Sequence, residues 1–160
     1  MINKIISGGQ TGADIGGLLA AKELNIPTGG TAPKGYRTEL GSNFDLIKYG
    51  VIEHKSANYQ PRTIENVRNS DGTVWFGNQN SPGGKLTIST CVKLKKPHII
   101  NPSKTQLRDW IERKFIRVLN CSGNRESTNI GIQEHVKNFL IEVLNYGSKN
   151  ESNNNQFDQI

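Results

Sequence analysis

The sequence predicts an α/β layer fold with a mainly parallel sheet. Short apolar runs typical of buried strands alternate along the chain with stretches whose apolar residues have helical spacing. A glycine-rich loop joins the first expected strand to the first expected helix, and further polar clusters follow later strands. In open parallel sheets ligands bind outside the carboxyl ends of the strands, so these clusters are the candidate site. With 160 residues, the chain is long enough for one domain with a sizeable core.

The first half of the chain opens with a strand expected over residues 4–7. Ile15, Leu18 and Leu19 then mark one side of a helix expected over residues 13–24. Residues 29–35, which read GGTAPKG, are rich in turn formers and predict a loop. The further elements expected in this half are a strand at 51–53, a helix at 63–69 and, after a turn at 70–72, a strand at 73–76.

The second half begins with another glycine-rich loop, residues 81–84, ahead of a helix expected over residues 86–94. A strand at 98–100, a helix containing Leu107, Trp110 and Ile111, and a strand at 116–120 follow. The last helix is marked by an apolar stripe of Val136, Phe139, Leu140, Val143 and Leu144. Residues 1–147 are therefore expected to form a single ligand-binding domain, and the Asn- and Ser-rich residues 148–160 a disordered tail.

The charge of the chain narrows the class of partner. Twenty Lys and Arg residues against 14 Asp and Glu residues give a formal net charge of +6, which suits anionic small molecules as well as nucleic acid. The charges are scattered, without a run typical of a nucleic-acid-binding arm, so we do not expect a nucleic-acid partner. The apolar stretches are too short for a signal peptide or a membrane span, so we expect no membrane contact and a cytoplasmic location.

The sequence does not assign a metal site or a catalytic residue. Cys91 and Cys121 lack CxxC spacing and His neighbours, so we expect buried free thiols and no metal. The three His residues, His54, His98 and His135, stand in unrelated contexts, which excludes a Ser-His-Asp arrangement by spacing. An acid–base pair would have to come from Asp14, Glu39, Asp71 or Glu126, and Asp71 belongs to a common turn pair that we leave outside the site.

The strongest candidate for ligand binding is the loop SGGQTGAD, residues 7–14, between the first strand and the first helix. Glycines bring several backbone N–H groups close to one anion, and the helix dipole adds positive potential at the same point. The residues assigned to this predicted phosphate cradle are Gly8, Gly9, Gln10, Thr11, Gly12 and Asp14. The dinucleotide fingerprint GxGxxG and the phosphate loop GxxxxGK[ST] are both absent, which disfavours a dehydrogenase or an ordinary NTPase.

Three further loops supply candidate ligand contacts. Lys34 and Arg37 are either anion-binding cations or ordinary surface residues, with Glu39 able to orient Arg37 or cap a short helix. The second glycine loop offers Gly83, Gly84 and Thr87 at a helix start. After the 116–120 strand, Arg125 and Ser127 are expected to clamp a phosphate, with Glu126 holding the arginine, unless this segment is only a polar turn. Arg62, by contrast, reads equally well as a peripheral salt-bridge partner.

Several of these motifs occur in the same order in a known family. They are residues 7–14, Pro33-Lys34-Gly35, residues 59–71 with Arg62-Thr63 and Asn66-Val67, and residues 119–132 with Arg125-Glu126-Ser127. Over residues 2–146 the chain resembles the family of putative molybdenum carrier proteins, also called circularly permuted YpsA-like proteins. The resemblance implies a three-layer, Rossmann-like fold of the SLOG superfamily, related to the "lonely guy" proteins. It also implies homo-oligomers that bind nucleotides or nucleotide-like ligands, including the phosphorylated pterin of molybdenum cofactor.

The chain departs from the family pattern at two places. Ile15 stands where members often have an arginine after the aspartate of the first motif. The related phosphoribohydrolases carry PGGxGTxxE with a catalytic glutamate, whereas this chain has Leu86 and Thr90 at the third glycine and the glutamate. The first departure argues against a role borrowed from that arginine, and the second favours binding over hydrolysis.

Together these observations predict a non-catalytic protein that carries, senses or sequesters a phosphorylated, nucleotide-like small molecule. Molybdenum cofactor (molybdopterin) and a nucleotide-derived signal are the two ligands considered, and the sequence does not separate them. The alternative is an enzyme that hydrolyses an N-glycosidic or phosphate bond of a nucleotide, with Asp14 or Glu126 as the acid–base residue.

Overall fold

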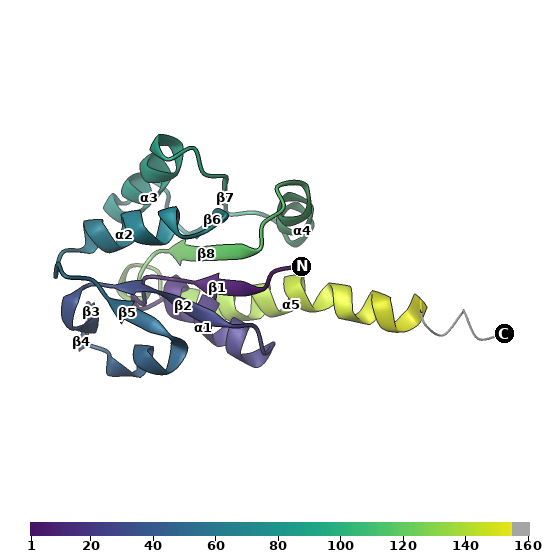
Figure 1. The fold of residues 1–160 in the computed structure, drawn as a ribbon, viewed down its shortest axis with the longest axis horizontal. Helices are drawn as coiled ribbons and strands as arrows, with labels where there is room; N and C mark the ends of the chain where they lie inside the picture. The colour runs from purple at the N-terminus through teal and green to yellow at the C-terminus, as the bar shows by residue number, and fades with distance from the viewer. Residues whose placement is uncertain (155–160) are drawn as a thin grey trace.

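The core of the protein is a six-stranded, all-parallel sheet with the strand order β5-β2-β1-β8-β6-β7 (Figure 1). The computed structural model describes the backbone of residues 1–154 and the side chains of residues 1–146. The sheet strands are β1 (Lys4–Ile6), β2 (Thr28–Ala32), β5 (Val51–Glu53), β6 (Gly72–Phe76), β7 (His98–Ile100) and β8 (Val118–Gly123). A short antiparallel hairpin, β3 (Arg37–Thr38) and β4 (Gly41–Ser42), lies outside this sheet.

Helices cover both faces of the sheet, which gives the predicted three-layer, Rossmann-like architecture (Figure 1). Helices α1 (Ala13–Glu23), α4 (Lys104–Arg113) and α5 (Ile132–Asn154) pack on one face. Helices α2 (Tyr59–Arg68) and α3 (Pro82–Lys93) pack on the other. Short 3-10 helices are η1 (Lys34–Tyr36), η2 (Phe44–Tyr49) and η3 (Glu126–Thr128).

The two faces of the sheet are chemically different. The α1/α4/α5 face is apolar: Ile5, Leu119 and Val74 from the strands pack with Leu107 of α4 and Leu140 of α5. The α2/α3 face instead buries polar side chains, namely Thr63, Asn66, Thr73, Thr87, Thr90 and Asn120. Buried polar groups need hydrogen-bond partners, so this second face is where the fold has the capacity to hold a polar ligand.

Most of the elements expected from the sequence are present. The strands expected at 4–7, 51–53, 73–76 and 98–100 and the helix expected at 13–24 are confirmed to within one residue at each end. The strand expected at 116–120 begins and ends later, as β8, and the helices α2 and α3 both begin four residues earlier than expected. Cys91 and Cys121 are confirmed as buried free thiols.

The expectation of a loop over residues 29–35 is wrong, because Thr28–Ala32 forms strand β2 between β1 and β5. One of the glycines that suggested a turn, Gly30, is required because the backbone at the end of β1 approaches β2 closely. A Cβ atom at Gly30 would lie 2.0 Å from the carbonyl oxygen of Ser7, and the φ of Gly30 is +126°. Glycine inside a strand is typical of such a close approach.

Helix α5 continues to Asn154, past the boundary at residue 147 expected from the sequence. Of the predicted polar tail, residues 155–160 lie outside the described residues. Within the described part of the chain, none of the helices combines the length and the apolar character that crossing a membrane requires.

Candidate functional site

The carboxyl ends of β1, β8 and β6 meet the amino ends of α1, α2 and α3 at one edge of the sheet (Figure 1). From β1 the chain passes through α1 to β2 on one side, whereas from β6 it passes through α3 to β7 on the other side. Such a reversal of direction opens a crevice between the loops that follow the strands. Three helix amino ends with their unpaired N–H groups also make this edge electrically positive.

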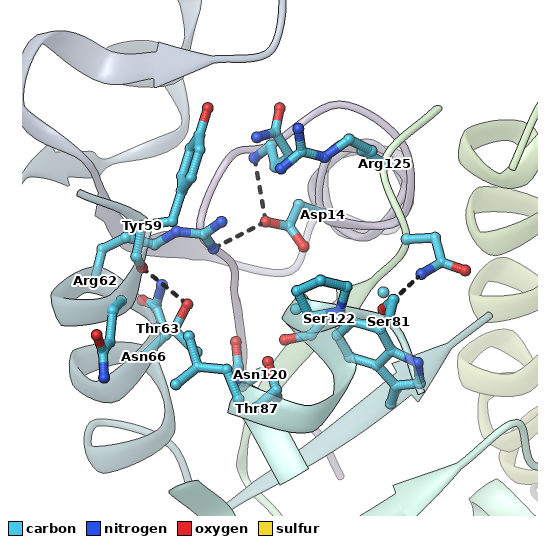
Figure 2. Close-up of a pocket in the computed structure, with 18 of the residues that line it drawn as sticks. Asp14, Tyr59, Arg62, Thr63, Asn66, Ser81, Thr87, Asn120, Ser122 and Arg125 are labelled. Carbon is cyan, nitrogen blue, oxygen red and sulfur yellow. Dashed lines mark hydrogen bonds and ion pairs between the residues drawn. The ribbon is translucent and has the colours of Figure 1, made fainter. Parts of the chain in front are cut away.

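A pocket of about 560 Å³ occupies the crevice on the α2/α3 side (Figure 2). Its size is typical of a small-molecule site. Gln10 and Asp14 come from the loop after β1, Arg62 and Thr63 from α2, and Asn120 from β8. The other lining residues are Tyr59, Gln60, Asn66, Trp75, Ser81, Pro82, Gly83, Leu86, Thr87, Ser122, Gly123, Asn124, Arg125 and Thr128.

The first glycine-rich loop forms one wall of this pocket, but its backbone amides already have partners within the chain. The amide of Gly9 donates to Ser7 Oγ at 3.3 Å and that of Gln10 to Asp14 Oδ2 at 3.1 Å. The amide of Thr11 donates to Gln10 Oε1 at 3.0 Å. The sequence predicted that these N–H groups would cradle a phosphate. These three amides are therefore already occupied by side chains of the same segment.

Gly12 shows why the loop contains glycine at its end. Its φ is +84°, and a Cβ atom would lie 2.4 Å from the carbonyl oxygen of Asn124 and 2.7 Å from the amide nitrogen of Glu126. The amide of Ala13 donates to the same Asn124 oxygen at 3.1 Å. The glycine therefore lets the loop after β1 pack directly on the loop after β8, which closes one end of the pocket.

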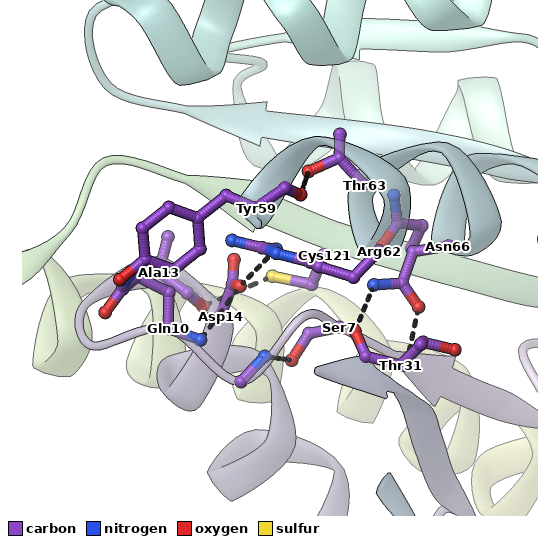
Figure 3. A network of polar contacts seen from close by, with 12 residues as sticks. Ser7, Gln10, Ala13, Asp14, Thr31, Tyr59, Arg62, Thr63, Asn66 and Cys121 are labelled. Atoms are coloured by element: carbon purple, nitrogen blue, oxygen red, sulfur yellow. Dashed lines mark hydrogen bonds and ion pairs between the residues drawn. The ribbon is translucent and has the colours of Figure 1, made fainter. Parts of the chain in front are cut away.

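Asp14 and Arg62 form a buried ion pair in the pocket wall, with 3.4 Å between Asp14 Oδ2 and Arg62 Nη1 (Figure 3). The side chains are 5% and 14% exposed. Burial raises the pKa of Asp14, although Arg62 and the amides of Gln10 and Gly8 oppose the shift. From the sequence, Arg62 could equally be a peripheral salt-bridge partner. In the structure it is buried and lines the pocket.

The β3–β4 hairpin is fastened to the two loops by Glu39. Its carboxylate accepts hydrogen bonds from the hydroxyls of Thr11 and Ser127 and, at 3.2 Å, from the amide of Ser127. Arg125 lies 3.9 Å away. Burial opposes ionisation of Glu39, but the hydrogen bonds from Ser127 and Thr11 outweigh it and lower the pKa. Glu39 thus contacts Arg125 and Ser127, the two residues that the sequence predicted would clamp a ligand phosphate.

The sequence offered two roles for Glu39, and the structure shows the cap of a short helix, because its carboxylate accepts from the amide of Ser127 in η3. The other pairings considered, Glu126 with Arg125 and Glu39 with Arg37, are not formed. Glu126 does not hold Arg125: its carboxylate accepts from the amides of Gly131 at 2.5 Å and Gln133 at 3.0 Å, at the start of α5. Glu39 does not orient Arg37, whose Nη1 donates to the carbonyl of Ala57 at 3.2 Å.

The second glycine-rich loop remains open toward the pocket. Ser81 Oγ accepts from the amide of Gly84 at 3.1 Å and so caps α3, and Asn124 Nδ2 donates to the same oxygen at 3.2 Å (Figure 2). Gly83 is exposed and lines the pocket. Because Gly83 lies in the first turn of α3, its N–H has no acceptor within the helix.

Cationic side chains surround the rim. The guanidinium groups of Arg37, Arg62 and Arg125 lie 5.0, 5.6 and 5.5 Å from the centre of the Tyr59 ring. Each distance is within the range of a cation–π contact. Tyr59 starts α2, so the three cations gather at the positive end of that helix, where an anion is favoured.

The predicted site residues divide into two groups in the structure. Gln10, Asp14, Gly83, Thr87 and Arg125 line the pocket. The others do not line it: Gly8, Gly9, Thr11, Gly12 and Gly84 belong to the loops that shape it, Ser127 is bound to Glu39, Arg37 contacts Tyr59 at the rim, and Lys34 is an exposed residue of η1. A ligand-binding role for any of them stays a prediction.

Four buried polar atoms among the described residues have no hydrogen-bond partner: Gln10 Nε2, Arg62 Nε, Trp75 Nε1 and Asn120 Oδ1. All four side chains line this one pocket. An unpaired buried polar group is costly and rare in native proteins, so the coincidence indicates a site whose partner atoms come from outside the chain. The sequence analysis missed Trp75 and Asn120. The signal that could have found Asn120 is an amide between the apolar residues Leu119 and Cys121 of a strand.

The fold and the site define a Rossmann-like protein with a polar, cation-rimmed pocket at the carboxyl edge of its sheet. The chain belongs to the circularly permutated YpsA SLOG family, whose sequence model matches residues 5–144. Its fold is similar to that of a protein from Syntrophus aciditrophicus SB described as a putative molybdenum carrier protein, solved by crystallography at 1.45 Å resolution. The two share 35% sequence identity over 89% of this chain and 94% of the other, with a TM-score of 0.80. No curated protein matches the sequence.

Proposed function

We propose that this protein binds a phosphorylated, nucleotide-like small molecule in the 560 Å³ pocket and does not transform it. The observation that carries the proposal is the set of four unpaired buried polar atoms on the walls of that pocket. Three of them are donors, on Gln10, Arg62 and Trp75, which suits a ligand rich in acceptor oxygens and nitrogens.

The phosphate is expected at the rim. Arg125 lines the pocket there and is held only loosely by Glu39, with a separation of 3.9 Å. Its guanidinium can form a bidentate pair with a phosphate. The amino ends of α2 and α3 add positive potential. A molybdopterin and a nucleotide-derived signal both combine a phosphate with a planar ring, and the name of the S. aciditrophicus relative favours the first.

The test is binding of a panel of nucleotides, cyclic nucleotides and pterin phosphates, by calorimetry and thermal shift, together with native mass spectrometry of protein purified from its host. Arg125→Ala is expected to weaken binding at least about tenfold, because a charge-assisted hydrogen bond is lost. Arg113→Ala is the matched control, since Arg113 is exposed on α4 across the sheet and is expected to leave affinity unchanged. No bound ligand and no thermal shift with any of these compounds would refute the proposal.

A second candidate function, hydrolysis of an N-glycosidic or phosphate bond of a nucleotide, is favoured by Asp14. A buried carboxyl with a raised pKa at the wall of a pocket is typical of a general acid. Incubation with the nucleotide panel and chromatography of the products separates the two functions. Turnover by the wild-type protein that is lost in Asp14→Asn would refute the proposal of a non-catalytic binder and establish an enzyme.

A further inference from the structure

We infer that Trp75 and Asn120 form a recognition floor that binds the uncharged, planar end of the ligand and so determines which heterocycle the pocket accepts. The inference rests on the proposed function, and it assigns the two ends of the ligand to two ends of the pocket. The arginine rim takes the phosphate, and the floor takes a ring that carries both a hydrogen-bond donor and an acceptor.

The register of the sheet directs both side chains into the pocket. Strands β6 and β8 pair with Thr73 opposite Asn120 and Trp75 opposite Ser122. Side chains two residues apart on a strand share a face, so these four side chains lie on the α2/α3 side. Trp75 is 3% exposed and Asn120 2%, and both line the pocket.

One hydrogen bond orients the amide of Asn120 and leaves its carbonyl oxygen without a partner in the pocket wall. Asn120 Nδ2 donates to Thr73 Oγ1 at 3.1 Å, which fixes the orientation of the amide. The remaining Oδ1 is an unpaired acceptor, and the indole Nε1 of Trp75 is an unpaired donor. The floor therefore presents one donor and one acceptor, both neutral.

Two neighbouring polar side chains of the pocket, those of Asn66 and Thr63, are already bonded within the chain. The amide of Asn66 holds the backbone of Thr31 through two hydrogen bonds, of 2.8 and 2.9 Å (Figure 3). The hydroxyl of Thr63 donates to the carbonyl of Tyr59 at 3.1 Å. These contacts belong to α2 itself and to its packing on β2. They leave Trp75 and Asn120 to be satisfied by the ligand.

The charged side chains of the pocket lie at its other end. Among the described lining residues, the acidic and basic ones are Asp14, Arg62 and Arg125. Figure 2 shows these three around the upper part of the pocket and Asn120 and Thr87 at the bottom. A phosphate on the floor would meet no cation, whereas a neutral ring would meet the indole and Leu86 as well as the two hydrogen-bonding atoms.

The experiment compares ligand fragments on matched variants. Affinities of ribose 5-phosphate, the four common nucleoside 5′-monophosphates and a pterin phosphate are measured by calorimetry on the wild type, Trp75→Phe and Asn120→Leu. Trp110→Phe is the control, because Trp110 is equally buried but lies on α4 across the sheet. Trp75→Phe keeps an aromatic ring and removes the N–H donor. It is expected to lower the affinity for the best heterocyclic ligand about five- to tenfold, the effect of one hydrogen bond. It should leave ribose 5-phosphate unchanged.

The wild-type protein supplies a second measurement that does not depend on how well a variant folds. Methylation of the ring nitrogen donor of the preferred base should weaken binding by a similar factor. Two outcomes would overturn the inference and leave the proposed function standing. In the first, Trp75→Phe and Asn120→Leu weaken the binding of ribose 5-phosphate and of the nucleotide equally. In the second, neither these variants nor base methylation changes the affinity. Failure of every phosphorylated probe to bind would refute both this inference and the proposed function.

Discussion

The loops at residues 7–12 and 81–84 both follow a buried parallel strand and both lead into a helix, yet they use their backbone amides differently. In the first loop the amides of Gly9, Gln10 and Thr11 donate to side chains of the same segment. In the second loop a single cap from Ser81 occupies the Gly84 amide, and Gly83 stays exposed on the pocket wall. A glycine-rich strand–helix junction therefore predicts a close approach of the backbone, but not what it approaches.

The difference follows from what each loop has to hold. The first loop packs on the loop after β8 and on the β3–β4 hairpin, through Gly12 and through the Glu39 contacts. The second loop begins α3 at the side of the crevice, and its Ser81 accepts a hydrogen bond from Asn124 in the loop after β8. The described amides of the first loop thus hold the chain itself together, whereas Gly83 of the second loop stays exposed on the pocket wall.

The largest expected effect is a difference in protein stability between glycine substitutions in the two loops. Gly12→Ala places a Cβ atom 2.4 Å from backbone at a positive φ, so we expect a loss of about 3–5 kcal/mol in the free energy of unfolding. Gly83→Ala is the matched variant, because its Cβ would meet Trp75 at an ordinary 3.7 Å, and stability should change by no more than about 1 kcal/mol. Urea unfolding measures both. Equal losses would show that the two loops are packed alike.

The next effect is a pH dependence expected for the first loop, because it donates hydrogen bonds to two carboxylates, those of Asp14 and Glu39, whose pKa values are shifted in opposite directions. The pKa of Asp14 is raised above 3.8, so the folded state binds its proton more tightly than the unfolded state. Relative to Asp14→Asn, the wild type should lose stability as the pH rises from 3.8 through the folded pKa, by at most about 1.4 kcal/mol per pH unit.

Glu39→Gln is the counterpart with the opposite sign. The pKa of Glu39 is lowered below 4.5, so its stabilising contribution is present above pH 4.5 and is lost as the pH falls through the folded pKa. Unfolding in urea at a series of pH values between about 3 and 7 gives both slopes. Slopes of the same sign for the two variants would contradict the contacts assigned to these carboxylates.

The smallest effect concerns the cap of the second loop. Ser81→Ala removes the acceptor for the Gly84 amide and should cost about 1 kcal/mol, typical of a lost helix cap. Ser89→Ala in the same helix is the control: its exposed hydroxyl donates to the carbonyl of Leu86, and we expect a change within about 0.5 kcal/mol. Thermal unfolding followed by circular dichroism is sufficient. An equal effect of both substitutions would mean that the cap contributes nothing.

Local patterns predicted most of the fold because the interactions that form its elements are local. The apolar spacing of α1 and α5 and the buried runs of β1, β6 and β7 were legible, since an element that packs on a core needs apolar residues at its own period. Strand β2 was missed because Thr28–Ala32 contains two glycines, which a one-dimensional pattern assigns to turns. Only the neighbouring backbone of Ser7 explains Gly30.

The site was predicted in part for the same reason. Gln10, Asp14, Gly83, Thr87 and Arg125 stand in loops or helix starts that follow strands, and the rule for parallel sheets places those at one edge. Arg62, Trp75 and Asn120 lie within a helix and two strands, where a polar atom counts as functional only when its partners are known. Glu39 was recognised as a candidate, but its partners lie 28 and 88 residues away in sequence.

By itself the sequence determined the α/β class, the parallel sheet, the family resemblance and the edge at which polar loops gather, because hydrophobic period and glycine placement act over a few residues. The tertiary structure alone decided which amides of those loops are already bonded, which carboxylate contacts the residues expected to clamp a phosphate, and which buried atoms remain unpaired. Hydrogen-bond satisfaction is a property of atoms that meet across the chain, so it appears only when β6, β8, α2 and the loops after β1 and β8 are brought together.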